Sequence, residues 1–162
     1  MSIGEEVLET KLVGAYNAAN VMAALAVGRQ FGVPLQDGLA AVAAYTPSNN
    51  RSQMTRTERN VIIEDAYNAN PSSMAAALDN FALLQADCKI VMLGDMRELG
   101  EDSVKEHVCI VEKLADCGLT HACLVGEEFR KALAETGTPS CVKWFATSDE
   151  LAAALEIGRA HV

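Results

Sequence analysis

VIIEDAYNANPSSM, residues 61–74, is the stretch of sequence that decides the fold. Its first three residues are β-branched and apolar, which suits a strand buried on both faces, and a polar turn follows them. Asn70 and Pro71 then have the residue types of a helix N-cap and a first helical position. Apolar residues recur at helical spacing from Met74 onward. The turn therefore lies at the carboxyl end of a predicted parallel strand, where open α/β sheets bind ligands.

The same order of strand and helix recurs along the rest of the chain. The spacing of the strand-like runs suits right-handed βαβ units, and it predicts an α/β fold: a Rossmann-like, doubly wound, mostly parallel sheet with flanking helices. The strand at 61–64 is expected to neighbour the next strand of this sheet. The residue types at 103–106 match a capping box that opens a helix. The expected strands are 61–64, 89–93, 121–125 and 142–145, and the expected helices are about 71–86, 103–117, 127–136 and 148–158.

The first part of the chain has a different character. Two Ala-rich helices are predicted at about 17–31 and 36–45, and the breaker cluster TPSNNR follows them. We place a domain boundary there: residues 1–47 are expected to be a helical remnant, the end of a central ATP-binding domain, and residues 48–162 a Rossmann-like domain. Alternation at 52–57 predicts a short edge strand. No further strand follows the last predicted helix, so we expect the sheet domain to be truncated before its last strand.

Composition and charge exclude several classes of function. The chain has 162 residues and a formal net charge of −9, which argues against a nucleic-acid face and against binding to an anionic membrane surface. It has no apolar run long enough for a membrane span and no signal-peptide pattern at its start. The five cysteines are odd in number and lack CxxC spacing, which argues against a disulfide framework or a zinc site. We expect buried thiols in a reducing, cytoplasmic compartment.

Two polar turns carry the candidate site, since neither a GxxxxGK[ST] nor a GxGxxG motif is present. Asp65 is suited to accept hydrogen bonds from ribose hydroxyls. Asn68 and Asn70 fit either a small polar ligand or plain turn and capping chemistry. Arg51 fits either a clamp on phosphate or a solvated linker cation. The second turn, LGDMRELG at 93–100, is expected at the same sheet edge, with charges that are either functional or merely solvated.

Four stretches resemble the Mur ligases of peptidoglycan synthesis: LVGAYNAANVMAALA at 12–26, NNRSQ at 49–53, EDAYNANPSSM at 64–74 and LGDMRELGEDSVKEH at 93–107. The pair DAYNANP and LGDMxELG is similar specifically to the branch that adds D-alanyl-D-alanine to UDP-N-acetylmuramoyl-tripeptide. The resemblance implies an ATP- and Mg²⁺-dependent amide ligation, in which ATP phosphorylates a carboxylate and the dipeptide amine displaces phosphate. The UDP-binding domain and the P-loop of that family are not in this sequence. We therefore expect the chain to be inactive by itself and to work only within a full-length ligase.

The resemblance also implies roles for individual residues around ATP. Asn17 and Asn20 match the family's HNxxN element, whose second Asn is expected near the adenine. This sequence has Tyr16 where that element has His, so no role is carried over for that side chain. Arg51 matches the linker arginine expected at the ATP phosphates, and Asp65 matches the acid expected at the ribose.

The remaining implied roles belong to the two turns. Tyr67 is expected at the nucleotide, and Asn68 and Asn70 at the incoming dipeptide. No chemical step is assigned to the second motif, no catalytic residue is assigned within this chain, and no metal ligand is named. The unassigned residues of that motif are Asp95, Glu98 and His107, the last of which is expected to be a partly exposed helix residue.

A second class of function stays open from the sequence. A free-standing Rossmann-like module could bind a nucleotide or a partner without catalysis. The first two helices distinguish the readings: a ligase remnant would leave apolar surface exposed over residues 12–45, with a dimer as one way to cover it, whereas a self-sufficient module would pack these helices fully.

Overall fold

The computed structural model describes residues 2–3, 6–14, 17–47 and 53–159. The chain forms two compact units, Met1–Asn68 and Ala69–Val162. Each unit is described by itself below. The domain boundary at 47/48 stays a prediction. No helix in the described ranges is long and apolar enough to cross a membrane.

The first unit contains two helices and two short hairpins. Helices α1 (Asn17–Gln30) and α2 (Leu35–Ala44) pack around Val21 and Leu39, with Leu8 beside them. Strands β1 (Ser2–Ile3) and β2 (Glu6–Val7) pair antiparallel, as do β3 (Gln53–Arg56) and β4 (Val61–Glu64). Many large apolar side chains of the helices and of the segments that connect and follow them stay exposed: Met22, Val27, Phe31, Val33, Leu35 and Tyr45.

The position predicted for β4 is wrong in one respect. Its four residues form the expected strand, but the strand pairs with β3 and has no place in the parallel sheet formed by the described residues. Val61 is 52% exposed and Ile62 44%, so the strand is not buried on both faces. The turn explains the pairing: the Thr57 N–H donates to the Asn60 carbonyl and the Asn60 N–H donates to the Thr57 hydroxyl. So short a loop closes at little entropic cost. β-Branched residues favour a strand but do not choose its partner.

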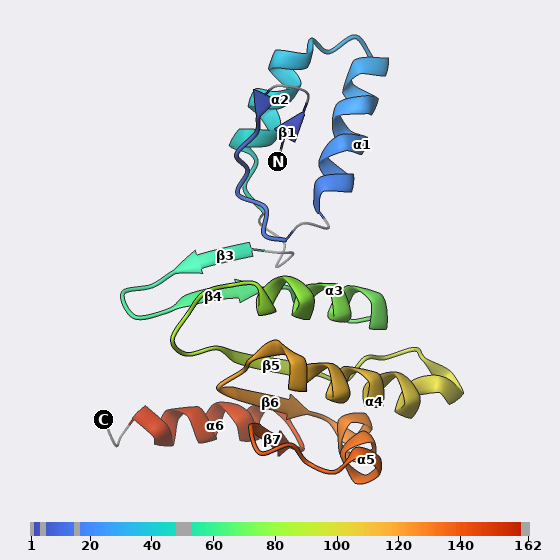
Figure 1. Cartoon of the computed structure of the whole chain (residues 1–162), viewed down its shortest axis with the longest axis vertical. Helices are drawn as coiled ribbons and strands as arrows, with labels where there is room; N and C mark the ends of the chain where they lie inside the picture. The colour runs from blue at the N-terminus through green and yellow to red at the C-terminus, as the bar shows by residue number, and fades with distance from the viewer. Residues whose placement is uncertain (1, 4–5, 15–16, 48–52, 160–162) are drawn as a thin grey trace. The chain divides into compact units, whose positions relative to one another are not determined.

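The second unit is the predicted α/β sheet. Strands β5 (Ile90–Gly94), β6 (His121–Val125) and β7 (Val142–Phe145) run parallel in the order β5-β6-β7 (Figure 1). Helices alternate with them in sequence, as right-handed crossovers require. They are α3 (Pro71–Ala82), α4 (Ser103–Leu114), α5 (Glu127–Thr136) and α6 (Ser148–Arg159), with 3₁₀ turns at Gly100–Asp102 and Ala115–Cys117.

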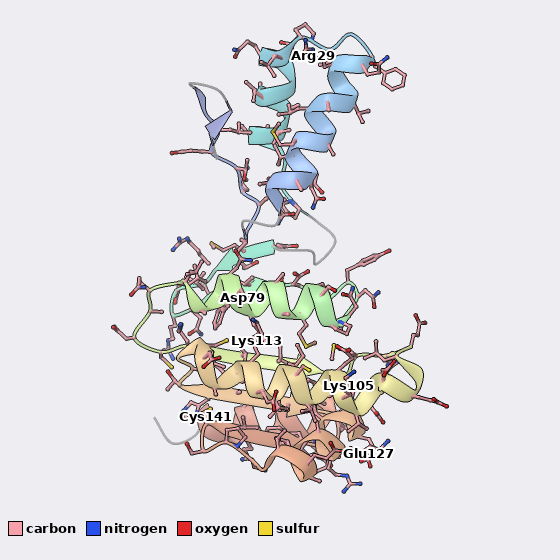
Figure 2. All side chains as sticks on the ribbon, turned by 45° about the vertical axis from the view of Figure 1, so that its right-hand side comes forward. Arg29, Asp79, Lys105, Lys113, Glu127 and Cys141 are labelled. Atoms are coloured by element: carbon pink, nitrogen blue, oxygen red, sulfur yellow. The ribbon has the colours of Figure 1, made fainter. Side chains whose placement is uncertain are left out.

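Both faces of this sheet are covered by helices, which confirms the doubly wound arrangement. Alternate residues of β6, Ala122 and Leu124, point into the main core, which α3, α4 and α5 complete. Cys123 points to the other face, where it packs with Phe145 and with Leu151 of α6. An ion pair between Lys113 of α4 and Asp79 of α3 links two helices of the main core at the surface (Figure 2).

The two predicted helix starts have different outcomes. Asn70 caps α3 as expected: its side chain accepts the Ser73 N–H, the Ser73 hydroxyl accepts the Asn70 N–H, and Pro71 is the first helical residue. The capping box predicted at 103–106 is wrong. A 3₁₀ turn runs directly into α4, so the N-cap residue Asp102 already has helical dihedrals and makes no side-chain cap.

Candidate functional site

A cavity of about 660 Å³ lies at the carboxyl ends of β5, β6 and β7, within the second unit. This is the edge at which open parallel sheets bind ligands. The loop that follows β5, residues 93–100, supplies one wall. The starts of α5 and α6 supply the others. The lining residues are Gly94, Asp95, Met96, Arg97, Glu98, Leu99, Gly100, Ser103, Val125, Gly126, Glu128, Ala146, Thr147 and Ser148.

Asp95 fixes this loop to helix α5. Its carboxylate accepts the N–H groups of Glu128 and Phe129, each at 3.0 Å, and its own N–H donates to the Val125 carbonyl at 3.1 Å. The positive end of the α5 dipole also stabilises a carboxylate at this position. Gly126 makes the approach possible, because a Cβ there would lie 2.3 Å from the carboxylate. Of the two readings left open for this turn, a merely solvated charge does not hold for Asp95.

His107 is buried, contrary to its predicted partial exposure. Its side chain is fully covered, and its ring meets the Phe129 ring edge to face at 4.7 Å. Nε2 accepts the Met96 N–H at 3.0 Å, and Nδ1 lies 2.7 Å from the Ser103 carbonyl oxygen. The signal was present in the sequence, because position 107 begins the same helical stripe as the buried residues Ile110, Val111 and Leu114.

The third wall is a capped helix start that the motifs did not reveal. Thr147 accepts the Glu150 N–H at 3.2 Å, and the Glu150 carboxylate accepts the Ala146 N–H at 2.9 Å. Thr147 therefore caps the start of α6, and Glu150 reaches back to the residue before the cap. The Trp144 indole N–H donates to the Gly126 carbonyl at 2.7 Å and ties this wall to the start of α5.

Charged side chains of both signs reach the cavity. Arg97 and Glu98 are exposed on the loop, and Glu98 has φ +66°, the left-handed region that residues other than glycine rarely adopt. Glu128 lies opposite, at the start of α5. The Lys131 ammonium and the Ser103 hydroxyl hydrogen-bond its carboxylate and lower the pKa of Glu128. The cavity therefore offers a guanidinium group and carboxyl groups to a small polar ligand.

The residues predicted to contact ATP through α1 do come together. The Asn20 amide donates to the Asn17 side-chain oxygen at 3.1 Å, and the Asn17 amide donates to the Val13 carbonyl at 2.7 Å. Asn17 is buried and fixes the start of the helix, whereas Asn20 is exposed and can face a ligand. Tyr16 and Arg51 lie outside the described residues.

The remaining predicted residues follow β4. Asp65, Tyr67 and Asn68 lie on an exposed turn of the first unit, and Asn70 caps α3 in the second. Across the described ranges, none of the residues predicted to bind ATP or substrate lines the cavity. No group of three or more potential metal ligands occurs in those ranges either.

Comparison with known proteins identifies the family. The model of the family described as "Mur ligase, glutamate ligase domain" matches residues 50–161. The chain belongs to the Mur ligase family. The match includes all three strands of the cavity edge and the loop 93–100.

Individual Mur ligases are similar to this chain in sequence and in fold. The chain is 34% identical over 128 residues to the UDP-N-acetylmuramoyl-tripeptide–D-alanyl-D-alanine ligase of Treponema pallidum, covering 78% of the chain and 27% of that protein. It is 32% identical over 120 residues to the enzyme of the same name from Escherichia coli, covering 72% of the chain and 26% of that protein. A crystal structure of MurF from Acinetobacter baumannii superposes with a TM-score of 0.80 at 31% identity, covering 91% of the chain and 33% of that chain. The chain thus spans about a quarter of the length of these curated relatives.

Proposed function

We propose that this chain is the C-terminal part of an ATP-dependent amide ligase that adds D-alanyl-D-alanine to UDP-N-acetylmuramoyl-tripeptide in peptidoglycan synthesis. One observation carries the proposal: the loop of the second Mur-like motif forms a wall of a polar cavity at the carboxyl edge of the sheet. The relatives that bear the name of this ligase, at 34% and 32% identity, support the choice within the family. The proposal includes a cytoplasmic location.

The proposed reaction has two steps. The tripeptide carboxylate attacks the γ-phosphorus of ATP, and an acyl phosphate forms as ADP leaves. The free amine of D-alanyl-D-alanine then attacks the acyl carbon, phosphate leaves, and the amine loses a proton as the amide forms. Charge develops in both steps, so the site must be closed, dry and lined with fixed polar groups.

The first unit would contribute mainly to ATP binding. The Asp65 carboxylate is chemically suited to the ribose hydroxyls, the exposed Asn20 amide to the adenine edge, and the exposed Tyr67 ring to the nucleotide. Asn68 and Asn70 would border the dipeptide. Mg²⁺ would neutralise the phosphates, but no residue of the described ranges is assigned to hold it, because they contain no cluster of suitable ligands.

The exposed apolar surface of the first unit favours a ligase over a self-sufficient module. Phe31 is 83% exposed and Val27 58%. Such surface is expected where a unit packs against further protein. A dimer through these helices has no support from the comparisons and is not part of the proposal.

Nucleotide binding tests the alternative module directly. Titration calorimetry of this chain with ATP should give a dissociation constant in the millimolar range, about −4 kcal/mol, because most phosphate contacts of a ligase lie outside it. A micromolar constant for the chain alone would instead support a free-standing nucleotide-binding module.

Arg51 tests the proposed ligase. In the complete ligase, Arg51→Ala should lower kcat on the order of 100-fold, as expected for the loss of a cation that stabilises phosphoryl charge. Arg59→Ala removes an exposed arginine of the β3–β4 turn and serves as the matched control, with kinetics near those of the wild type. Equal kinetics for both variants would remove Arg51 from the site.

A further inference from the structure

His107 is the most deeply buried ionisable side chain among the described residues. The proposed reaction gives it no step, and its ring does not line the cavity. A buried imidazole must have both nitrogens satisfied, and here both have partners.

The partners indicate which ring nitrogen carries the proton. A backbone N–H can only donate, so Nε2 must accept from Met96 and carries no proton. A carbonyl can only accept, so Nδ1 carries the proton and donates to Ser103. With these partners the ring has the Nδ1–H form, and the Asp95 carboxylate lies farther from Nε2, at 3.8 Å. A proton on Nε2 would replace its acceptor with a donor and break the bond to Met96.

The bond to Met96 acts on the cavity wall. Met96 follows Asp95 and precedes the exposed pair Arg97 and Glu98, and its own side chain is 1% exposed. Asp95 attaches the start of the loop to α5, and His107 attaches the next peptide to α4. Two successive residues are thus anchored to two different helices, and Arg97 separates them from Glu98, the loop's non-glycine residue with positive φ. Backbone of this kind persists only where its surroundings hold it.

We propose that His107 is a positioning residue of the ligase. Through the Met96 N–H, it holds the loop 95–100 in the shape in which Arg97 and Glu98 line the cavity, and so supports substrate binding there. This inference rests on the proposed function for its kinetic consequence. Its structural part, the Nδ1–H ring that accepts from Met96, rests on the contacts alone.

Two variants separate the two hydrogen bonds. Asn is short and places its amide near the position of Nδ1, so His107→Asn keeps the bond to Ser103 and loses the bond to Met96. Gln is longer and places an oxygen near the position of Nε2, so His107→Gln keeps an acceptor for Met96. Both lose the ring contact with Phe129 and should lose similar stability in urea. His121→Asn, at the exposed start of β6, is the matched control.

The first measurement uses this chain and NMR. The ¹⁵N shifts of the wild-type ring should show an unprotonated Nε2 and a protonated Nδ1. The Met96 amide should be protected from exchange in the wild type and in His107→Gln, and exchange at least about tenfold faster in His107→Asn. A ring protonated on Nε2, or equal Met96 protection in both variants, would overturn the inference.

The second measurement uses the complete ligase. His107→Asn should raise the KM of the substrate that binds against loop 95–100 about tenfold with a smaller change in kcat, and His107→Gln should restore that KM to within about threefold of the wild type. A merely structural role would lower the amount of folded enzyme and leave KM unchanged, which would contradict the inference. If the wild-type ligase fails to join D-alanyl-D-alanine, the proposed function fails, whereas the NMR result still decides the role of His107.

Discussion

Asp95 and Gly126 depend on each other, because the Asp95 carboxylate fits only where residue 126 has no side chain. The carboxylate occupies the space that a side chain at position 126 would need, and it satisfies two N–H groups at the start of α5. A glycine is required there for space and also for its φ of +117°. The acid therefore has a structural role in the cavity wall, whatever else it does.

Gly126→Ala should destabilise the chain more than Gly137→Ala. Both glycines flank α5 and have positive φ, but nothing lies within 4 Å of a Cβ at 137, so Gly137→Ala measures backbone strain alone, about 1 kcal/mol. Gly126→Ala adds the clash with Asp95 and should cost about 1–3 kcal/mol more. Urea unfolding of the two variants checks this. Equal losses would mean that the Asp95 carboxylate moves away at no cost.

Thiol reactivity should follow burial. Cys88 and Cys109 are exposed, whereas Cys117 and Cys123 are buried, and burial raises the pKa of both buried thiols. Only the thiolate reacts, so a disulfide reagent at pH 8 should label the exposed pair quickly and the buried pair only after unfolding. Cys88→Ser combined with Cys109→Ser should remove the fast phase. Fast labelling of Cys117 or Cys123 in this double variant would contradict their burial.

A raised thiol pKa also has a consequence for stability. The folded state favours the protonated thiol of Cys117, so this stabilisation is complete below the thiol's ordinary pKa and is lost as the pH rises through the higher folded value. The free energy of unfolding should therefore fall on the alkaline side. Cys117→Ala should weaken that pH dependence when urea unfolding is repeated at several alkaline pH values.

The start of α3 shows how far local sequence determines an element. Asn70, Pro71 and Ser73 have the residue types of a capped helix start, and the structure has the capping box that these types form. The two readings of Asn70, cap and substrate contact, are compatible, because only one of its two side-chain polar atoms is needed for the cap.

Substitutions at Asn70 separate these two readings. Asn70→Ala should cost about 1 kcal/mol in the free energy of unfolding, whereas Asn70→Asp keeps the acceptor and should cost almost nothing. Ser72→Ala, one residue into α3 beyond Pro71, is the control and should stay within about 0.5 kcal/mol of the wild type. If Asn70→Asp keeps stability but lowers ligation by the complete enzyme, the amide itself contacts substrate. Unchanged ligation would leave Asn70 with the cap alone.

Two features that prediction from the sequence missed are the partner of β4 and the contacts of His107. Strands, helices and their order could be predicted, because apolar periodicity and helix-start chemistry are local. The partner of β4 could not be predicted, because the same β-branched run fits a hairpin or a parallel sheet. The burial of His107 was predictable from its helical stripe, but its bond to Met96 depends on how the loop folds back over α4.

At the scale of the whole molecule, the residues proposed for ATP and the residues of the cavity lie in different units. Asn20, Asp65 and Tyr67, proposed for ATP, lie in the first unit, and the cavity with Arg97 and Glu98 lies in the second. The loop at 93–100 lines a cavity at the predicted edge of the sheet, whereas the turn at 65–70, predicted for the same edge, does not line it. The motifs did not show that the ATP residues and the cavity residues belong to separate compact units, because motif order says nothing about which elements share a core.

The most direct test of the central claim is a ligation assay with the complete ligase, ATP, Mg²⁺, UDP-N-acetylmuramoyl-tripeptide and competing amines. Mass spectrometry should show the tripeptide extended by D-alanyl-D-alanine, with one ADP formed for each amide, and no product with diaminopimelate or D-glutamate. Preferential ligation of a single amino acid, or ADP release without an amide product, would contradict the proposed function.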